Sequence, residues 1–262
     1  MTTGNQPLLT IVIPAYNEHM RLPATLATVQ AYVTRTQLDA EVIVADDGSS
    51  DDTAQIVQTA AQQWPQLRLL ALDHRGKGFA VRAGALAARG RYVLLCDADL
   101  AVPVEEWDRM LPFFTQQQYD VVIGSREGQG AHREGEPFHR HLMGRVFNTI
   151  VRVLVVGNFH DTQCGFKAFR TEVAQDLFHR ARIYGADAPV IQGAAVTAFD
   201  VEIIYLAMAR GYRVAELPVV WHYGVETKVD PIRDAMRNLR DVVNVRWLAI
   251  RGEYRNLDDP KV

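Results

Sequence analysis

Short apolar runs alternate with segments of helical periodicity along the first half of the chain. Apolar runs bounded by turn residues predict buried strands, and the 3.6-residue pattern predicts helices. In order, the predicted elements are strand Leu8–Ile13, helix Leu22–Val33, strand Glu41–Ala45, helix Asp51–Trp64, strand Leu67–Leu72, helix Gly78–Arg89, strand Tyr92–Cys96, helix Val104–Gln117 and strand Asp120–Gly124. This alternation is typical of a mostly parallel sheet flanked by helices. We therefore predict an α/β fold whose first strand is ended by Pro14.

The pattern is looser in the second half of the chain. Residues 126–140 and 185–198 show little periodicity and predict loops, whereas Val201–Ala209 predicts a helix. The sequence contains no repeat, low-complexity tract or linker. We predict a single domain that ends in an amphipathic helix at residues 229–251.

Two carboxylates follow the apolar run that ends at Cys96. Asp97 and Asp99 are separated by Ala98, and side chains two positions apart on an extended segment point the same way. Ligands of open α/β sheets bind at the carboxyl ends of the strands. Paired carboxylates there suit a divalent cation that also contacts phosphate oxygens. Taken alone, the pair is equally consistent with one Asp capping a helix and the other being solvated.

The turn after the first strand excludes a dinucleotide-binding Rossmann site. Such a site needs Gly-x-Gly-x-x-Gly, and this turn reads Pro14-Ala-Tyr-Asn-Glu18. The ring of Tyr16 offers a surface to flank a base, and Glu18 can accept hydrogen bonds from ribose hydroxyls. Taken alone, these residues are better explained by ordinary turn and helix-start chemistry.

Two further strand ends carry candidate ligand-binding residues. Asp46 and Asp47 place two negative charges at the end of the second strand, where one of them could accept the imide N–H of uracil. Gly76 and Lys77 lie at a predicted helix start, which favours an anion or a base. The spacing is not that of a nucleoside-triphosphate loop, which needs Ser or Thr after its Lys. A glycine-rich loop with a solvated lysine is the alternative.

Composition narrows the class and location of the protein. The net charge of −3 gives no reason to expect nucleic-acid binding. Two cysteines, Cys96 and Cys164, make no disulfide framework and indicate a reducing compartment. Residues 1–6 lack a signal-peptide pattern, and no stretch approaches the roughly 18 apolar residues of a membrane span. We expect a cytoplasmic protein whose membrane contact is peripheral, at the cytoplasmic face.

Several strings along the chain together resemble a known family. Pro-Ala-Tyr-Asn-Glu, Asp-Asp-Gly-Ser, Arg-Gly-Lys-Gly, Asp-Ala-Asp and Gly124-Ser-Arg126 lie at successive strand ends, as in the nucleotide-sugar half of family 2 (GT-A fold) glycosyltransferases. Asp161-Thr-Gln-Cys-Gly-Phe-Lys-Ala-Phe169, Phe199-Asp-Val-Glu202 and Pro218-Val-Val-Trp-His222 resemble dolichyl-phosphate β-glucosyltransferases and their prokaryotic polyprenyl-phosphate relatives. The resemblance implies a Rossmann-like GT-A domain with a nucleotide-sugar half at residues 8–125 and an acceptor half at 126–228.

The resemblance also implies roles for individual residues. Those expected to bind substrate are Pro14, Ala15, Tyr16, Glu18, Asp46, Asp47, Gly76, Lys77, Asp97, Ala98, Gln163 and Lys228. Asp97 and Asp99 are expected to bind Mg²⁺ or Mn²⁺, with Asp99 the more direct ligand. The alternative for Lys228 is an exposed lysine without a role.

The implied reaction is an inverting transfer of a hexose, glucose, from a nucleoside diphosphate, UDP, to a polyprenyl or dolichyl phosphate. A phosphate monoester has its second pKa near 6, so it needs little help from a base. Arg126 and Lys167 are the expected cationic partners of the phosphates. Asp161, and after it Asp200, are the candidates for orienting the acceptor or acting as a weak base. A loop cap and a helix N-cap are their structural alternatives.

Two apolar stripes with helical spacing could bring such an enzyme to a lipid acceptor. One lies in His139–Val156 with arginines two turns apart, and the other in Arg233–Arg251. The second consists of Met236, Leu239, Val243 and Trp247 among Arg233, Arg237, Arg240 and Arg246. Either stripe could instead be the core face of a packed helix. Two rival functions also stay open: glycosyl transfer to a soluble hydroxyl acceptor, and nucleotide-sugar binding without catalysis.

Overall fold

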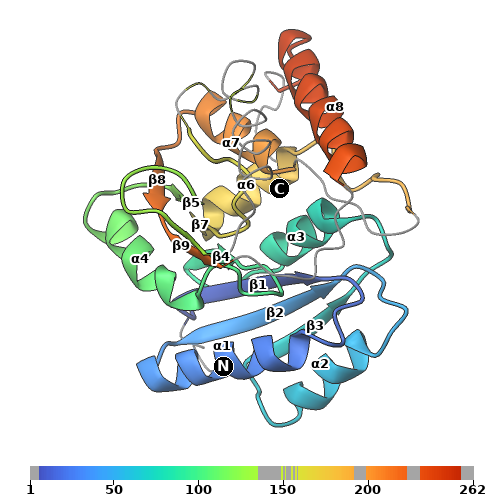
Figure 1. Ribbon diagram of the computed structural model, residues 1–262, viewed down its shortest axis with the longest axis vertical. Helices are drawn as coiled ribbons and strands as arrows, with labels where there is room; N and C mark the ends of the chain where they lie inside the picture. Colours follow the sequence, from blue (N-terminus) through green and yellow to red (C-terminus); the bar gives the residue numbers. More distant parts are fainter. Residues whose placement is uncertain are drawn as a thin grey trace.

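A computed structural model of the 262-residue chain describes residues 6–134, 149, 151, 155, 157, 159–191, 199–222 and 231–254. The alternation predicted for the first half is confirmed (Figure 1). Its elements are β1 (Leu9–Ala15), α1 (Leu22–Thr36), β2 (Ala40–Asp46), α2 (Thr53–Ala61), β3 (Leu67–Ala71), α3 (Lys77–Leu86), β4 (Tyr92–Leu95), η1 (Val104–Glu106), α4 (Trp107–Thr115) and β5 (Val121–Ser125).

The second half adds strands to the same sheet and helices to one of its faces. Its described elements are β6 (His132–Glu134), β7 (Lys167–Arg170), α6 (Thr171–Arg180), α7 (Phe199–Ala209), β8 (Val214–Pro218), β9 (Val220–His222) and α8 (Pro231–Ile250). The main sheet has the order β3-β2-β1-β4-β7-β5-β8. All of its neighbours are parallel except β7, which runs antiparallel between β4 and β5. The mostly parallel sheet that the sequence predicted is therefore confirmed.

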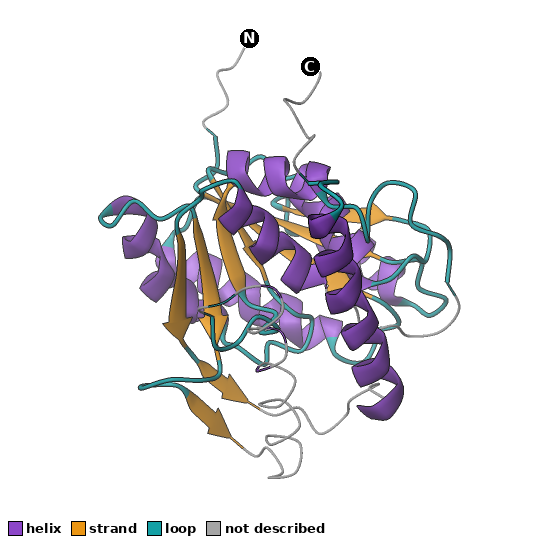
Figure 2. Ribbon diagram, turned by 90° about the horizontal axis from the view of Figure 1, so that it is seen from above, coloured by secondary structure: helices purple, strands orange, loops and turns teal. Residues whose placement is uncertain are grey.

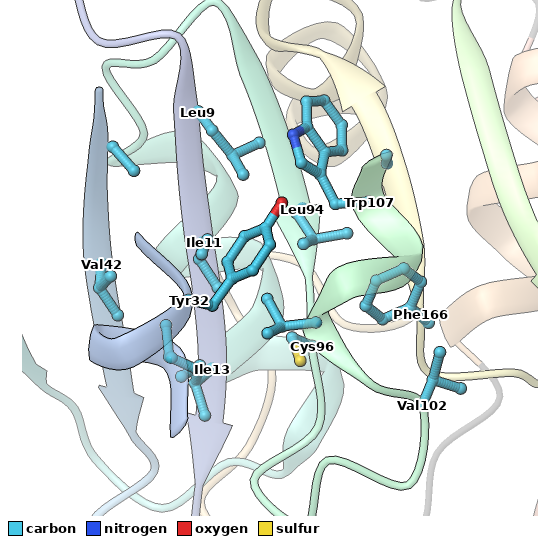
Figure 3. Close-up of a cluster of buried hydrophobic side chains, with 14 of the residues drawn as sticks. Leu9, Ile11, Ile13, Tyr32, Val42, Leu94, Cys96, Val102, Trp107 and Phe166 are labelled. Carbon is cyan, nitrogen blue, oxygen red and sulfur yellow. The ribbon is translucent and has the colours of Figure 1, made fainter. Parts of the chain in front are cut away.

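Two apolar clusters hold the helices on opposite faces of the sheet. Figure 3 shows part of the first cluster, in which Tyr32 of α1 and Trp107 of α4 pack on Ile11 and Leu94. The second cluster packs α3, α6, α7 and α8 on the other face, through residues such as Val12. Figure 2 shows the strands running between helices. Both faces of the strands are buried, which explains their unbroken apolar runs.

Two predictions about local structure were wrong. Pro14 does not end the first strand, because it pairs in register with Ala45 of β2. Proline is tolerated there since β4, the other neighbour of β1, pairs only as far as Val12. Residues 126–140 are not wholly a loop either, because β6 lies within them and pairs with β9. A strand of three residues is too short to give a readable alternation.

Only one of the two predicted apolar stripes lies mainly within the described residues. The stripe in His139–Val156 lies outside the described residues, apart from isolated positions. The stripe in Arg233–Arg251 falls on α8, whose buried residues are a different set that includes Asn238, Val242 and Val245. Within the described ranges, no helix is both long enough and apolar enough to cross a bilayer.

Candidate active site

Three cationic side chains lie at the edge of the sheet where β4 and β5 end, and each is bound to an aspartate. The pairs are Lys77 with Asp97, Arg126 with Asp161, and Lys167 with Asp200. Strand β7 brings them together, because Lys167 pairs in register with Leu95 of β4 and Ile123 of β5. Those two strands lead directly to Asp97 and Arg126. The antiparallel strand thus unites residues that are far apart in the sequence.

The pair of Lys77 and Asp97 is the most exposed of the three. Nζ of Lys77 lies 2.6 Å from Oδ1 of Asp97, and the side chains are 37% and 33% exposed. Gly165 leaves room for this carboxylate, since a Cβ at Gly165 would overlap Oδ2 of Asp97. Burial alone would raise the pKa of Asp97, but the charge of Lys77 holds the pKa below its usual value. Asp97 therefore carries its negative charge at neutral pH.

Asp99 is exposed, two residues beyond Asp97. The two carboxylates do not follow one another on an extended segment, as the sequence suggested, because Asp97–Leu100 forms a turn closed by a hydrogen bond from Leu100 N–H to Asp97 O (3.0 Å). Leu100 has a φ of 48°, a left-handed conformation that costs a leucine about 1–2 kcal/mol. The backbone N–H of Ala101 donates to Oδ1 of Asp99 (3.0 Å). These contacts fix the direction in which Asp99 faces.

Asp161 is fully buried and holds Arg126 through two parallel hydrogen bonds. Nε of Arg126 donates to Oδ2 of Asp161 (2.6 Å), and a terminal nitrogen donates to Oδ1 (2.9 Å). The guanidinium also lies over the ring of Trp221, 5.6 Å from its centroid. Burial alone would raise the pKa of Asp161, but the Arg126 guanidinium holds it well below its usual range. Asp161 is thus a fixed anion that orients Arg126.

The third pair lies deeper in the protein. Nζ of the buried Lys167 donates to Oδ1 of Asp200 (2.5 Å) and to the carbonyl oxygen of Cys164. Burial raises the pKa of Asp200 above its ordinary value, although Lys167 opposes this effect. Lys167 therefore fastens the 164–167 turn, and with it Gly165, to the first turn of α7. Lys167 is therefore not a solvated strand residue, because its side chain is only 1% exposed.

The stack of Tyr16 on His74 forms the other side of the site. The two rings are parallel, with planes 2° apart and centroids 3.9 Å apart. Nδ1 of His74 lies 2.8 Å from Oδ2 of Asp47, and Asp47 also accepts the backbone N–H groups of Arg75 (2.8 Å) and Gly76 (2.8 Å). The carboxylate of Asp47 thus anchors the 74–76 loop beside Tyr16. A glycine is favoured at position 76 because its φ of 98° is a conformation that residues with a Cβ rarely adopt.

The remaining residues expected on this side support the two turns. Pro14 and Ala15 close β1, and the backbone carbonyl of Glu18 accepts the first N–H groups of α1. The carboxylate of Asp46 accepts both the N–H and the hydroxyl of Ser49. Burial raises the pKa of Asp46. Glu18 therefore shows the helix-start chemistry that the sequence left open for it, whereas the turn role of Asp46 was not expected from the sequence.

Comparison with known proteins now identifies the family. The model of "Glycosyl transferase family 2" matches residues 10–178. The chain belongs to glycosyl transferase family 2. As a member of this family, the protein is a glycosyltransferase with the GT-A fold that the sequence predicted.

Its relatives include proteins named dolichyl-phosphate β-glucosyltransferase. The one from Dictyostelium discoideum is 32% identical over 94% of this chain and 76% of its own length, and the human one is 30% identical over 94% and 77%. Among solved structures, a mannosyltransferase from Pyrobaculum calidifontis in complex with GDP-Man and Mn²⁺ gives a TM-score of 0.59 at 22% identity, covering 95% of this chain and 65% of its own. A glucosyl-3-phosphoglycerate synthase from Mycobacterium tuberculosis with Mn²⁺ and UDP gives 0.62 at 19% identity, covering 98% and 81%. These structures support the fold.

The donor atoms in this glycosyltransferase suit a cation that is shared with its substrate. Asp97 and Asp99 offer the hard carboxylate oxygens that Mg²⁺ and Mn²⁺ prefer. No group of three or more acidic, histidine or cysteine side chains within the described ranges could hold a metal by itself. A cation at Asp97 and Asp99 would therefore take its further ligands from water or from substrate oxygens such as those of a diphosphate.

The structure brings most of the sequence candidates of this glycosyltransferase together. The backbone N–H of Gln163 donates to Oδ1 of Asp161 (3.2 Å), and the carbonyl of Ala98 accepts the hydroxyl of Thr25 (2.5 Å). Lys228 lies outside the described residues. His74 and Gly165 were missed as site residues. Gly165 lies within the Asp161–Phe169 string and His74 directly precedes the Arg-Gly-Lys-Gly string, but only their tertiary contacts with Asp97 and Tyr16 show what they do.

Proposed function

We propose that this family 2 glycosyltransferase moves glucose from UDP-glucose to a polyprenyl phosphate such as dolichyl phosphate, with inversion at the anomeric carbon, at a membrane surface. The observation that carries the proposal is the similarity, over 94% of the chain, to relatives named dolichyl-phosphate β-glucosyltransferase. The site supports it by charge, because two phosphorylated substrates would meet beside three fixed cations.

The donor would lie across the carboxyl ends of β1, β2 and β4. The Tyr16–His74 stack offers an aromatic surface for the base, and Asp47 holds the loop beneath it. The diphosphate would sit near Lys77 and the N-terminus of α3, where backbone N–H groups and the lysine charge favour an anion. We keep in this proposal the halves that the sequence suggested, 8–125 for the donor and 126–228 for the acceptor.

Asp97 and Asp99 would hold the divalent cation, Mg²⁺ or Mn²⁺. A bound cation would supply charge neutralisation for the departing diphosphate. Asp99 is the more accessible ligand, because Asp97 is bound to Lys77. The amine of Lys77 would also contact the diphosphate, because it already lies beside the carboxylate of Asp97.

The acceptor phosphate would bind at Arg126, where Asp161 fixes the guanidinium and Gln163 lies alongside. Its nucleophilic oxygen is ionised at neutral pH, since the second pKa of a phosphate monoester is near 6. The site agrees with a reaction that needs no base, because Asp161 and Asp200 are each bound to a cation. We assign both aspartates an orienting role: Asp161 positions Arg126, and Asp200 positions Lys167.

The outer face of α8 would hold the enzyme at the membrane. Met236, Val243, Trp247 and Ile250 are 52% to 67% exposed and lie along one side of this helix. Arg240 and Arg246 are exposed beside them. An apolar stripe with a tryptophan and arginines matches the interface of an anionic bilayer in both polarity and charge. An enzyme held in this way would reach the phosphate group of an acceptor whose lipid chain lies in the bilayer.

The test is mass spectrometry of the products formed from a polyprenyl phosphate and a panel of nucleotide sugars with Mg²⁺ or Mn²⁺. We expect one hexose on the lipid phosphate, formed fastest from UDP-glucose, and a β-anomer by NMR. Asp99→Asn, which keeps the size of the side chain, is the matched control and should lose transfer. Transfer only to a soluble hydroxyl acceptor, with a rate that follows the ionisation of one carboxylate, would refute the lipid assignment. Donor binding without any transfer would instead favour a non-catalytic protein.

A further inference from the structure

Residues 182–191 pack against the loop that precedes α3. The backbone N–H of Ile191 donates to the carbonyl of His74 (2.9 Å). From the other side, the guanidinium of Arg75 donates to the carbonyls of Ala186 (3.0 Å) and Ala188 (3.2 Å). We call residues 182–191 the clasp. The clasp adds a second support to a loop that Asp47 already holds from the sheet.

Tyr184 is the clasp residue that reaches α3 itself. A Cβ at Gly78 would lie 2.8 Å from Cγ of Tyr184, so the ring packs directly on the backbone of Gly78. The hydroxyl of Tyr184 donates to Oδ2 of Asp241 on α8 (2.6 Å). Burial, with the charge of Asp241, raises the pKa of Tyr184, so this hydroxyl stays a donor at neutral pH. Gly78 directly follows Lys77, whose amine binds Asp97.

The clasp is itself fastened where it begins. The buried carboxylate of Glu202 on α7 accepts the backbone N–H groups of Arg182 (2.7 Å) and Ile183 (3.2 Å). It also accepts the hydroxyl of Tyr254 (2.8 Å). Tyr184 is thus placed by fixed groups on both sides, Glu202 before it and Asp241 at its hydroxyl. A ring held in this way can transmit a defined position to the backbone it touches.

We propose that Tyr184, oriented by Asp241, is a positioning residue for the donor: it fixes the first turn of α3 and thereby the reach of Lys77 toward the diphosphate. This inference rests on the donor role proposed for Lys77. A purely structural Tyr184 would stabilise the fold and leave the kinetics unchanged. A positioning Tyr184 changes donor affinity and leaves the chemical step intact.

The decisive variant is Tyr184→Phe, which removes only the hydroxyl. Tyr32→Phe is its matched control, because Tyr32 donates to Oδ1 of Asp108 over the same distance, 2.6 Å, and joins α1 to α4 on the opposite face of the sheet. Both variants should lower the melting temperature to a similar extent. If the free energy of this hydrogen bond is expressed in donor binding, Tyr184→Phe should raise the donor KM by up to about tenfold, with kcat within about twofold of wild type. Tyr32→Phe should leave both constants unchanged.

Calorimetric binding of UDP with Mn²⁺ separates this inference from the proposed function, because it needs no acceptor and no turnover. We expect about tenfold weaker UDP binding by Tyr184→Phe than by Tyr32→Phe. Equal UDP affinity in the two variants would overturn the inference even if wild type transfers glucose. A Tyr184→Phe enzyme with normal donor KM and reduced kcat would overturn it as well. If wild type binds UDP but transfers no sugar, only the proposed function fails.

Discussion

Replacing Asp161 with Asn tests whether the Arg126–Asp161 pair holds this side of the site. The substitution keeps the shape of the side chain but puts an NH₂ group where one oxygen accepts hydrogen bonds. Oδ2 accepts two N–H groups of Arg126, and Oδ1 accepts a third together with the N–H of Gln163. The NH₂ group of the asparagine would therefore face N–H groups that are themselves donors, and the guanidinium of Arg126 would lose its negatively charged partner.

The size of the effect follows from burial. Breaking a buried ion pair costs about 3–5 kcal/mol, whereas exposed pairs contribute less than about 1 kcal/mol. Asp161 is fully buried, but the side chain of Arg126 is 21% exposed and can regain some hydration. We therefore expect a loss of about 3 kcal/mol in the free energy of unfolding at pH 7. Glu105→Gln is the control, because it breaks the exposed pair of Arg35 and Glu105 (3.2 Å).

The pH dependence of the free energy of unfolding tests the sign of the contribution from Asp161. The pKa of Asp161 is lowered in the folded protein, so its contribution is fully present above the unfolded pKa of about 4 and is lost as the pH falls below that value. Urea unfolding of wild type and variant between pH 3 and pH 7 measures this directly. The difference between them should be constant above about pH 5 and shrink below about pH 4. A difference at pH 7 no larger than that of Glu105→Gln, or one that grows in acid, would refute the reasoning.

Three further substitutions test other parts of the site. Asp99→Ala should lower glucosyl transfer by at least about a hundredfold at saturating Mn²⁺, and near-normal turnover would remove Asp99 from the metal site. Gly165→Ala should displace the carboxylate of Asp97 and weaken UDP binding measured by calorimetry, with the far-UV circular dichroism unchanged. Trp247→Ser should reduce sedimentation with anionic liposomes at low salt, and wild type remaining in the supernatant would exclude the α8 surface as a membrane contact.

The elements of the first half were predictable because their signals are local. The apolar run from Tyr92 marks β4 because a strand buried on both faces leaves no room for polar positions. Tyr16, Asp47 and Lys77 follow strand ends, so the sequence alone placed them at one edge of the sheet. What each one contacts was not predictable. The stack of Tyr16 on His74 joins two turns that are separated by two strands and two helices.

The ion pairs of the site could not be predicted from the sequence for a different reason. Asp161 lies 35 residues from Arg126, and Asp200 lies 33 residues from Lys167. No periodicity links them, and they meet only because β7 enters the sheet antiparallel between β4 and β5. The resemblance to known glycosyltransferases supplied these residues as site candidates. It could not show that the two carboxylates hold cations in place.

The balance of charge in the site gives a physical reason for a divalent cation. Within the described residues, Lys77, Arg126 and Lys167 are each paired with an aspartate, and Asp99 adds one exposed carboxylate. These carboxylates offset much of the positive charge that would otherwise attract a nucleoside diphosphate to the site. The pairing is still required, because an unmatched buried cation would be costly and would not hold its position. A divalent ion bound at Asp97 and Asp99 would add two positive charges at the place proposed for the diphosphate. In the proposed site, donor binding would therefore depend on the metal, because Asp97 and Asp99 offset the lysine charge that would otherwise attract the diphosphate.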